Sequence, residues 1–285
     1  MAKNAPDERN ADQAAYWNGP GGRGWTDRQD LQDRVLAPVS AVLLERAAIA
    51  SGERVLDVGC GCGDTTIEIA KRIGPTGRVL GLDISAVMLA RARERTPPGA
   101  QIAFVEADAT TYSFASGSAD LLFSRFGVMF FAEPARAFAN MRAGLKRGGR
   151  VVFACWREPR QNPWILVPLR AATLHVPRLT EVGPEDPGPF AFASQERVQR
   201  ILTEAGFSEI ELSAVDLDLD IAVGRGLEGA VESVTEIGPS SRALQGQPAE
   251  LVAAARASIR EALAPFQKGN AVALKGAIWL TTARA

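Results

Sequence analysis

The chain has 285 residues, of which 46% are hydrophobic, 23% charged and 7% aromatic, a composition typical of a globular protein with a sizeable buried core. The 32 Lys and Arg residues nearly balance the 33 Asp and Glu residues, and the formal charge of -1 favours neither nucleic acid nor an anionic membrane as a partner. The sequence shows no uncharged apolar run near the roughly 20 residues that span a bilayer, and its start shows no apolar signal core, so we expect a cytoplasmic protein.

The first 50 residues predict a helical cap. A Gly-rich aromatic stretch covers residues 16–25. Apolar residues then recur at helical spacing, at Leu36, Val39, Leu43 and Leu44. We interpret residues 1–50 as a cap or lid that precedes a catalytic domain over residues 51–285.

From Arg54 onward, short apolar runs alternate with helical patterns that end in Gly or Pro, which is typical of βαβ units and a parallel sheet. The predicted strands cover residues 54–58, 78–83, 102–106, 119–124, 150–156, 209–219 and 271–282. Asp64, Ser85 and Ser194 are expected to cap the helices that follow them.

Two segments, at about 157–193 and 222–268, are longer than routine connections, and we interpret them as insertions on the substrate side of the domain. The first contains His175, the one histidine of the chain. Three cysteines, Cys60, Cys62 and Cys155, are too few for a disulfide framework or for the common structural zinc patterns. We therefore expect no metal site.

The most informative segment reads VLDVGCGCGD, from Val55 to Asp64. Its glycines, Gly59, Gly61 and Gly63, permit a tight turn and let a ligand lie against bare backbone at the carboxyl end of a strand. Asp83 ends the next strand, 20 residues beyond Gly63, where an acid accepts hydrogen bonds from a ribose. The order of strand, glycines, helix, strand and acid predicts a nucleoside site.

The charges around the loop indicate which nucleoside it binds. A dinucleotide fingerprint places its third glycine one residue later than Gly63 and leaves its helix N-terminus free for a pyrophosphate. Asp57 and Asp64 instead flank this loop with negative charge, which repels phosphate and suits an ammonium group. The sequence also has no Gly-Lys-Ser/Thr of a P-loop. S-adenosylmethionine joins a ribose to an ammonium group without phosphate.

These motifs resemble those of the class I S-adenosylmethionine-dependent methyltransferases, over roughly residues 50–220 and the last strand. The matching segments, in chain order, are residues 55–63, 81–85, 106–109, 119–127 and 145–152. The overall pattern of these motifs is similar to that of the bacterial-type ubiquinone/menaquinone-biosynthesis methyltransferases. The resemblance implies an α/β, Rossmann-like, doubly wound sheet of seven strands in the order 3-2-1-4-5-7-6, with the last strand antiparallel.

Together with the loop, the resemblance implies a site for S-adenosylmethionine, with S-adenosylhomocysteine as the product. The expected cofactor-binding residues are Asp57, Gly59, Cys60, Gly61, Gly63, Asp83, Ile84, Asp108, Ala109, Arg125 and Trp25. Asp108 would receive the exocyclic amine of adenine. Arg125 would touch the cofactor or an anionic substrate, or pair with a surface acid. Tyr16, Trp17, Trp25, Phe126 and Trp156 offer π-surfaces to the sulfonium if the cap folds over the site.

We expect methyl transfer to a small apolar or aromatic acceptor by direct displacement, because the methyl carbon is already activated and positioning supplies most of the catalysis. Residues 124–127 read SRFG, not the Asp/Asn-Pro-Pro-Tyr/Phe of enzymes that methylate planar amines in nucleic acids and proteins. His175 is the best candidate for a general base. An NAD(P)-dependent oxidoreductase and a non-catalytic nucleoside-binding module remain alternatives. The sequence leaves the oligomeric state open, with a homodimer among the alternatives.

Overall fold

A central sheet organises the computed structural model, which describes residues 7–179 and 183–285. Residues 1–6 of the expected cap and residues 180–182 of the first expected insertion lie outside this description. The strands are β1 (Arg54–Val58), β2 (Arg78–Asp83), β3 (Ile102–Glu106), β4 (Ala119–Arg125), β5 (Leu145–Trp156), β6 (Ser208–Asp220), β7 (Gln267–Lys268) and β8 (Ala271–Arg284).

The strand order is β3-β2-β1-β4-β5-β8-β6, and β8 runs antiparallel to β5 and β6. This confirms the predicted order, with β8 as the seventh predicted strand. The two-residue β7, which pairs with β8, was not anticipated. β5 begins at Leu145 rather than at residue 150, because Leu145 pairs with Ala119 across an irregular register at the start of β4.

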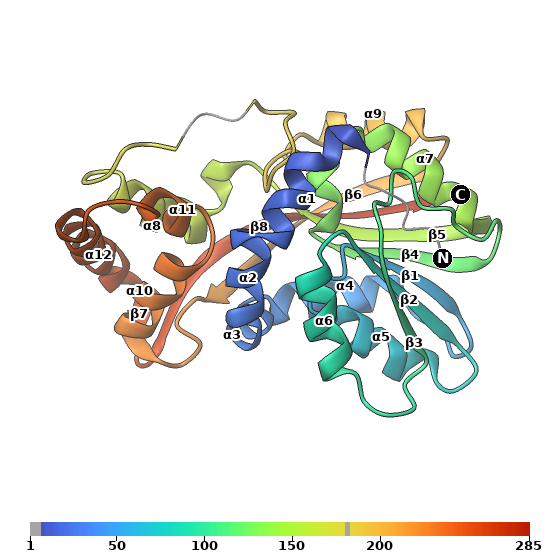
Figure 1. Cartoon of the computed structure of the whole chain (residues 1–285), viewed down its shortest axis with the longest axis horizontal. Coiled ribbons are helices and arrows are strands. Elements are labelled where there is room, and N and C mark those ends of the chain that lie inside the picture. Colours follow the sequence, from blue (N-terminus) through green and yellow to red (C-terminus); the bar gives the residue numbers. More distant parts are fainter. Residues whose placement is uncertain (1–6, 180–182) are drawn as a thin grey trace.

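Helices cover both faces of the sheet, so the central strands β1 and β4 are buried along most of their length. On one side lie α4 (Ala37–Ala47), α5 (Asp64–Ile73) and α6 (Ala86–Arg95), and on the other α7 (Pro134–Gly144) and α9 (Gln195–Glu204) (Figure 1). This arrangement is what right-handed crossovers produce when the chain winds outward from β1 and then returns to β4.

Local signals explain most helix starts. The hydroxyl oxygens of Ser85 and Ser194 accept hydrogen bonds from the backbone N–H groups of Met88 and Arg197, as expected of N-caps. The prediction that Asp64 caps α5 is wrong. Gly63, with φ +82°, occupies the cap position, and Asp64 is the first helical residue with its side chain turned to an ion pair.

The expected cap divides into two parts. The cap helices proper are α1 (Ala11–Asn18), α2 (Pro20–Asp27) and α3 (Gln29–Val35), preceded by a short 3-10 helix, η1 (Glu8–Asn10). The next helix, α4, packs on the sheet against β4, β5 and β6. We use "cap" below for residues 7–36.

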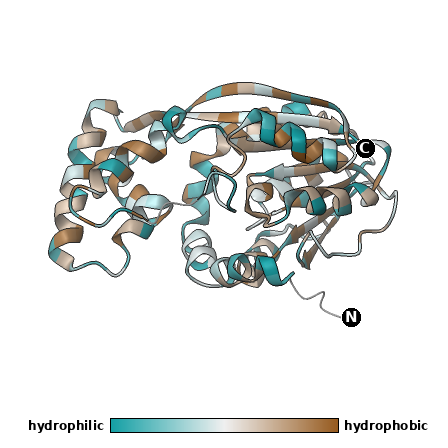
Figure 2. Ribbon diagram, turned by 90° about the horizontal axis from the view of Figure 1, so that it is seen from above, coloured by the Kyte–Doolittle hydropathy of each residue, from teal (hydrophilic) through white to brown (hydrophobic). Residues whose placement is uncertain are grey.

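The two insertions build a helical lobe, which we define as α8 (Pro163–Ala172), α10 (Gly226–Glu236), α11 (Pro239–Leu244) and α12 (Ala249–Leu263). α8 packs against α11 and α12, so segments from either side of β6 meet in one bundle. Figures 1 and 2 show this lobe set apart at one end of the long strands β6 and β8. Three short 3-10 turns complete the fold: η2 (Gly127–Phe130), η3 (Pro159–Gln161) and η4 (Ala264–Phe266). Within the described ranges, no helix combines the length and apolar character needed to cross a membrane.

Candidate active site

A cavity of about 670 Å³ lies where the carboxyl ends of β1, β2 and β4 meet the cap and the helical lobe. The carboxyl ends of parallel strands are where open α/β sheets bind ligands, and the volume is typical of a small-molecule site. Apart from Asp57 and Gly63, every expected cofactor-binding residue lines this cavity. The structure therefore brings the sequence motifs together in one place.

The glycine loop forms the floor of the cavity at the end of β1. Gly59, Gly61 and Gly63 all have positive φ, at +67°, +54° and +82°, a conformation that favours glycine. At Gly59, a Cβ would lie 2.5 Å from the Cα of Gly127, so the loop also touches the turn after β4 directly. The Oγ of Ser124 donates a 2.7 Å hydrogen bond to the carbonyl of Val58 and ties these two strand ends together.

Asp83 lies beside this loop at the end of β2, only 8% exposed. One carboxylate oxygen accepts a 2.7 Å hydrogen bond from the N–H of Gly61, and the other accepts a 2.9 Å bond from the N–H of Ser85. Burial raises the pKa of Asp83 above its usual value, and these N–H donors oppose that rise. Because each carboxylate oxygen can accept more than one hydrogen bond, Asp83 can still bind a ligand in the cavity that it lines.

Asp57 does not line the cavity and is fully buried behind the loop. Its Oδ2 accepts hydrogen bonds from the hydroxyls of Thr65 and Thr66, at 2.9 and 2.6 Å, while its Oδ1 has no partner among the described residues. Burial raises the pKa of Asp57 to about 6. The geometry does not support the expectation that Asp57 faces the ammonium group directly. The carboxylate instead anchors the first turn of α5.

Asp108 connects the cavity to the start of the cap. Its Oδ2 accepts a 2.7 Å hydrogen bond from the side-chain amide of Asn10 and a 3.0 Å bond from the N–H of Asp7, and its Oδ1 accepts from the N–H of Thr110. The amide oxygen of Asn10 accepts in turn from the N–H of Ala132. Asn10 was not among the residues predicted from the sequence, because nothing in its local sequence marks a partner 98 residues away.

The other end of α1 contacts the turn between β2 and α6, residues 84–86. The amide of Asn18 donates to the carbonyl of Ile84 at 2.9 Å and accepts from the N–H of Ala86 at 2.8 Å. The hydroxyl of Ser85 donates to the carbonyl of Trp17 at 2.6 Å. Both ends of α1 therefore contact segments expected to bind the adenosyl group.

Arg125 forms ion pairs rather than offering an open cation to a ligand. Its guanidinium contacts Asp64 at 2.8 Å, Asp33 at 3.5 Å and the hydroxyl of Ser40 at 2.6 Å. Arg95 also contacts Asp33, at 2.8 Å. Of the roles expected for Arg125, pairing with acids is the one the contacts show, although these acids line the cavity instead of the surface. Burial, with a smaller effect of Asp64, raises the pKa of Asp33.

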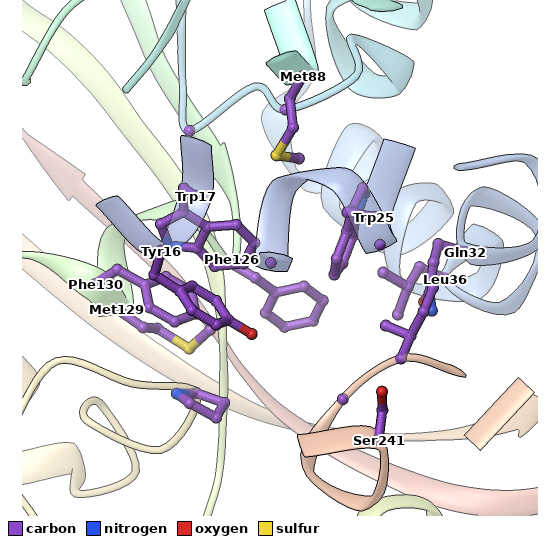
Figure 3. A pocket seen from close by; sticks show the side chains of 18 of the residues that line it. Tyr16, Trp17, Trp25, Gln32, Leu36, Met88, Phe126, Met129, Phe130 and Ser241 are labelled. Carbon is purple, nitrogen blue, oxygen red and sulfur yellow. The ribbon is translucent and has the colours of Figure 1, made fainter. Parts of the chain in front are cut away.

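Aromatic side chains from the cap and from the turn after β4 surround the middle of the cavity (Figure 3). Trp17 contacts Trp25 and Phe130 edge-on, with ring centroids 6.4 and 5.1 Å apart. Phe126 stacks on Trp156 at 4.1 Å, and its φ of +68° is unusual for a bulky residue. Such strained positions cluster at functional sites. The expected π-surfaces therefore do lie over the site.

His175 lies outside the cavity. It follows α8, and its Nε2 lies 2.7 Å from the hydroxyl of Ser258 on α12. The geometry thus gives no support to His175 as a general base. Cys60 and Cys62 are buried, and burial raises the pKa of Cys62 to about 11, which disfavours a reactive thiolate. Residues 7–179 and 183–285 contain no cluster of three or more His, Cys, Asp or Glu able to hold a metal ion.

Comparisons with known proteins agree with this geometry. Residues 55–149 match a family model described as a methyltransferase domain. A demethylmenaquinone methyltransferase of Staphylococcus aureus is 28% identical over 179 residues, which cover 60% of this chain and 74% of the relative.

Solved structures share the fold at lower identity. Phosphoethanolamine N-methyltransferase 2 of Haemonchus contortus, in complex with phosphomonomethylethanolamine and S-adenosylhomocysteine, superposes with a TM-score of 0.51 and 19% identity, covering 87% of this chain and 52% of its own. The 4+2 cyclase SpnF superposes with a TM-score of 0.54 and 18% identity, covering 99% of this chain and 97% of its own. The motif order, the strand order and the methyltransferase-domain match over residues 55–149 together support the resemblance of the chain to the class I S-adenosylmethionine-dependent methyltransferases.

Proposed function

We propose that the protein transfers the methyl group of S-adenosylmethionine to a small, predominantly apolar or aromatic acceptor. The observation that carries this proposal is the continuity of the cavity. It joins the glycine loop and Asp83 at one end to the aromatic side chains of the cap and then to the helical lobe. A macromolecular acceptor would need an open surface at this point, whereas the cap here covers the carboxyl ends of the strands.

The lining residues suggest which part of the cofactor each segment at this end of the cavity would bind. Asp83 and Ile84 would hold the ribose, Asp108 and Ala109 would frame the adenine, and the loop around Gly61 would lie under the methionyl group. Carboxylates dominate this end, which suits a cofactor with a sulfonium and an ammonium group. The rings of Trp25 and Phe126 would face the sulfonium, because aromatic faces attract cations.

The bound cofactor supplies a methyl carbon activated by positive sulfur, so the chain itself has to align the acceptor and exclude water. The edge-on cluster of Tyr16, Trp17 and Phe130 forms an apolar wall for that purpose. No histidine lines the cavity within the described residues. We therefore propose catalysis by alignment, with an acceptor whose own acidity or neutral nucleophilicity makes a protein base unnecessary.

We further propose that residues 7–36 act as the lid of this site and that residues 51–285 form the catalytic domain with the two insertions. We also propose that the protein works in the cytoplasm on a metabolite. The balanced charge supports a small-molecule partner rather than nucleic acid.

Transfer of a tritium-labelled methyl group to a panel of phenols, amines, thiols and carbon acids tests the proposal. We expect label in at least one apolar acceptor, and a loss of roughly 100-fold in kcat/KM for Asp83→Asn, which weakens cofactor binding without removing side-chain volume. Labelling of nucleic acid or protein, with none of the small acceptors, would contradict it.

A further inference from the structure

The charged side chains that line the cavity are distributed unequally. The four aspartates Asp33, Asp64, Asp83 and Asp108 all lie on the cofactor side. Of the three arginines that line the cavity, Arg125 pairs with two of these acids. Arg242 on α11 and Arg256 on α12 belong to the helical lobe, and neither forms an ion pair within residues 7–179 and 183–285.

Both of these arginines are exposed, and no acid among the described residues forms an ion pair with either. Arg256 donates a 2.7 Å hydrogen bond to the hydroxyl of Thr235, which leaves most of its five N–H donors for other partners. The side chain of Ser241 points into the cavity (Figure 3). Glu236 also lines the cavity, but its carboxylate is paired at 2.5 Å with Arg28 of the cap rather than with either of the two arginines.

An apolar region separates this end from the cofactor end. Its walls come from the cap and from the turn after β4, where Trp25, Leu36, Met129 and Phe130 face a common space (Figure 3). An elongated ligand would therefore meet carboxylates at one end, apolar walls in the middle and free arginines at the other.

We propose that Arg242 and Arg256 form an anion subsite, so that the acceptor is an apolar or aromatic molecule with a carboxylate, phosphate or sulfonate remote from the methylated atom. This inference rests on the proposed function and names its substrate class. Guanidinium groups make strong charge-assisted hydrogen bonds to such anions. In the reverse orientation the anion would face the aspartates, so the cavity also determines which end of the acceptor reaches the cofactor.

Two fluorescent dyes test the subsite without requiring methyl transfer. Anilinonaphthalene sulfonate and N-phenylnaphthylamine share one aromatic scaffold and differ by the sulfonate. In the S-adenosylhomocysteine complex, we expect the sulfonate dye to bind roughly fivefold more tightly than the neutral dye, and this preference to shrink at high salt. The double variant Arg242→Gln, Arg256→Gln should lose the preference and keep the affinity for the neutral dye within about twofold.

The matched control is Arg260→Gln, which removes one positive charge from the same helix. Arg260 pairs with Glu228 and does not line the cavity, so the preference should survive there. Equal affinity of the parent protein for the two dyes would overturn the subsite, as would loss of the preference in Arg260→Gln or parallel weakening of both dyes in the double variant. Binding of neither dye would overturn it too.

The same variants separate this inference from the proposed function. Methyl transfer that persists without any anion preference overturns the subsite alone. An anion preference in a protein that methylates no small acceptor overturns the proposed function, because the subsite would then serve another purpose.

Discussion

The two ends of the cavity are built in different ways. The cofactor end consists of backbone turns and of carboxylates bound by N–H groups, such as Asp83 between Gly61 and Ser85. The other end, which we propose binds the acceptor, consists of side chains from helices in the cap and in the helical lobe, outside the sheet. The cofactor end therefore follows from the geometry of the sheet, whereas the acceptor end can change its shape and charge without altering the sheet. This difference explains how one fold serves many acceptors.

Gly59→Ala should break the cofactor end most severely. The new Cβ would lie 2.5 Å from the Cα of Gly127, and φ at this position is +67°. Since backbone on both sides must move, we expect the free energy of unfolding to fall by roughly 3 kcal/mol or more, with loss of S-adenosylhomocysteine binding. Urea denaturation and calorimetry measure both.

Gly99→Ala is the matched control for that variant. Gly99 also has a positive φ, +79°, but a Cβ there meets nothing within 4 Å. It should cost only about 1 kcal/mol, the strain of the backbone conformation alone. Equal losses in the two variants would show that close approach of the two turns is unimportant.

Asp57→Asn measures how much the buried carboxylate beneath the glycine loop lowers the stability of the folded protein. The pKa of Asp57 in the folded protein, about 6, exceeds the ordinary 3.8, so the folded state binds this proton more tightly. The contribution of Asp57 to stability is therefore greatest below about pH 4 and is lost as the pH rises through 6. Above that pH the buried charge costs about 3 kcal/mol.

The asparagine variant keeps an acceptor for the hydroxyls of Thr65 and Thr66 but does not titrate. Relative to the parent, it should gain stability steadily between about pH 4 and 7. Urea titrations across that range provide the measurement. Parallel pH profiles of the two proteins would mean that Asp57 is not desolvated as the structure indicates.

Asn10→Ala sharpens the comparison, because Asn10 joins the cap to the cofactor end through its 2.7 Å bond to Asp108. Asn10 is only 3% exposed, and we expect its loss to weaken S-adenosylhomocysteine binding roughly tenfold, equivalent to about 1.4 kcal/mol. Hydrogen exchange should become faster in α1. Asp12→Ala, an exposed change on the same helix, should alter neither quantity. An unchanged affinity for S-adenosylhomocysteine in Asn10→Ala would show that this contact of the cap does not contribute to cofactor binding.

Trp25→Ala should have the smallest effect and a selective one. S-adenosylmethionine carries a positive sulfonium and its product does not. Loss of the aromatic face should therefore weaken the substrate form roughly fivefold relative to the product form, about 1 kcal/mol. Competition binding of the two ligands measures this ratio. Normal binding of both cofactor and acceptor by the variant would show that Trp25 has no role in the site.

The same contrast explains what could be predicted from the sequence. Strand order, the glycine loop and Asp83 follow from local turn chemistry and from the periodicity of βαβ units. The partners of Asp108 and Arg125 do not, because Asn10 and Asp33 lie 98 and 92 residues away. His175 resembles a catalytic residue by its rarity alone, and only packing of α8 on α12 shows that it lies elsewhere. Asp64 was predicted to cap α5 because aspartate is a preferred N-cap residue, but Gly63 takes that position.

The most direct test of the central claim, that the glycine loop and Asp83 form an adenosyl-cofactor site, is calorimetric titration of the purified protein. S-adenosylmethionine, S-adenosylhomocysteine and NADH would each be added to the parent and to Asp83→Ala. We predict that the first two ligands bind the parent, that Asp83→Ala abolishes their binding, and that NADH does not bind. Binding of NADH alone would contradict the account.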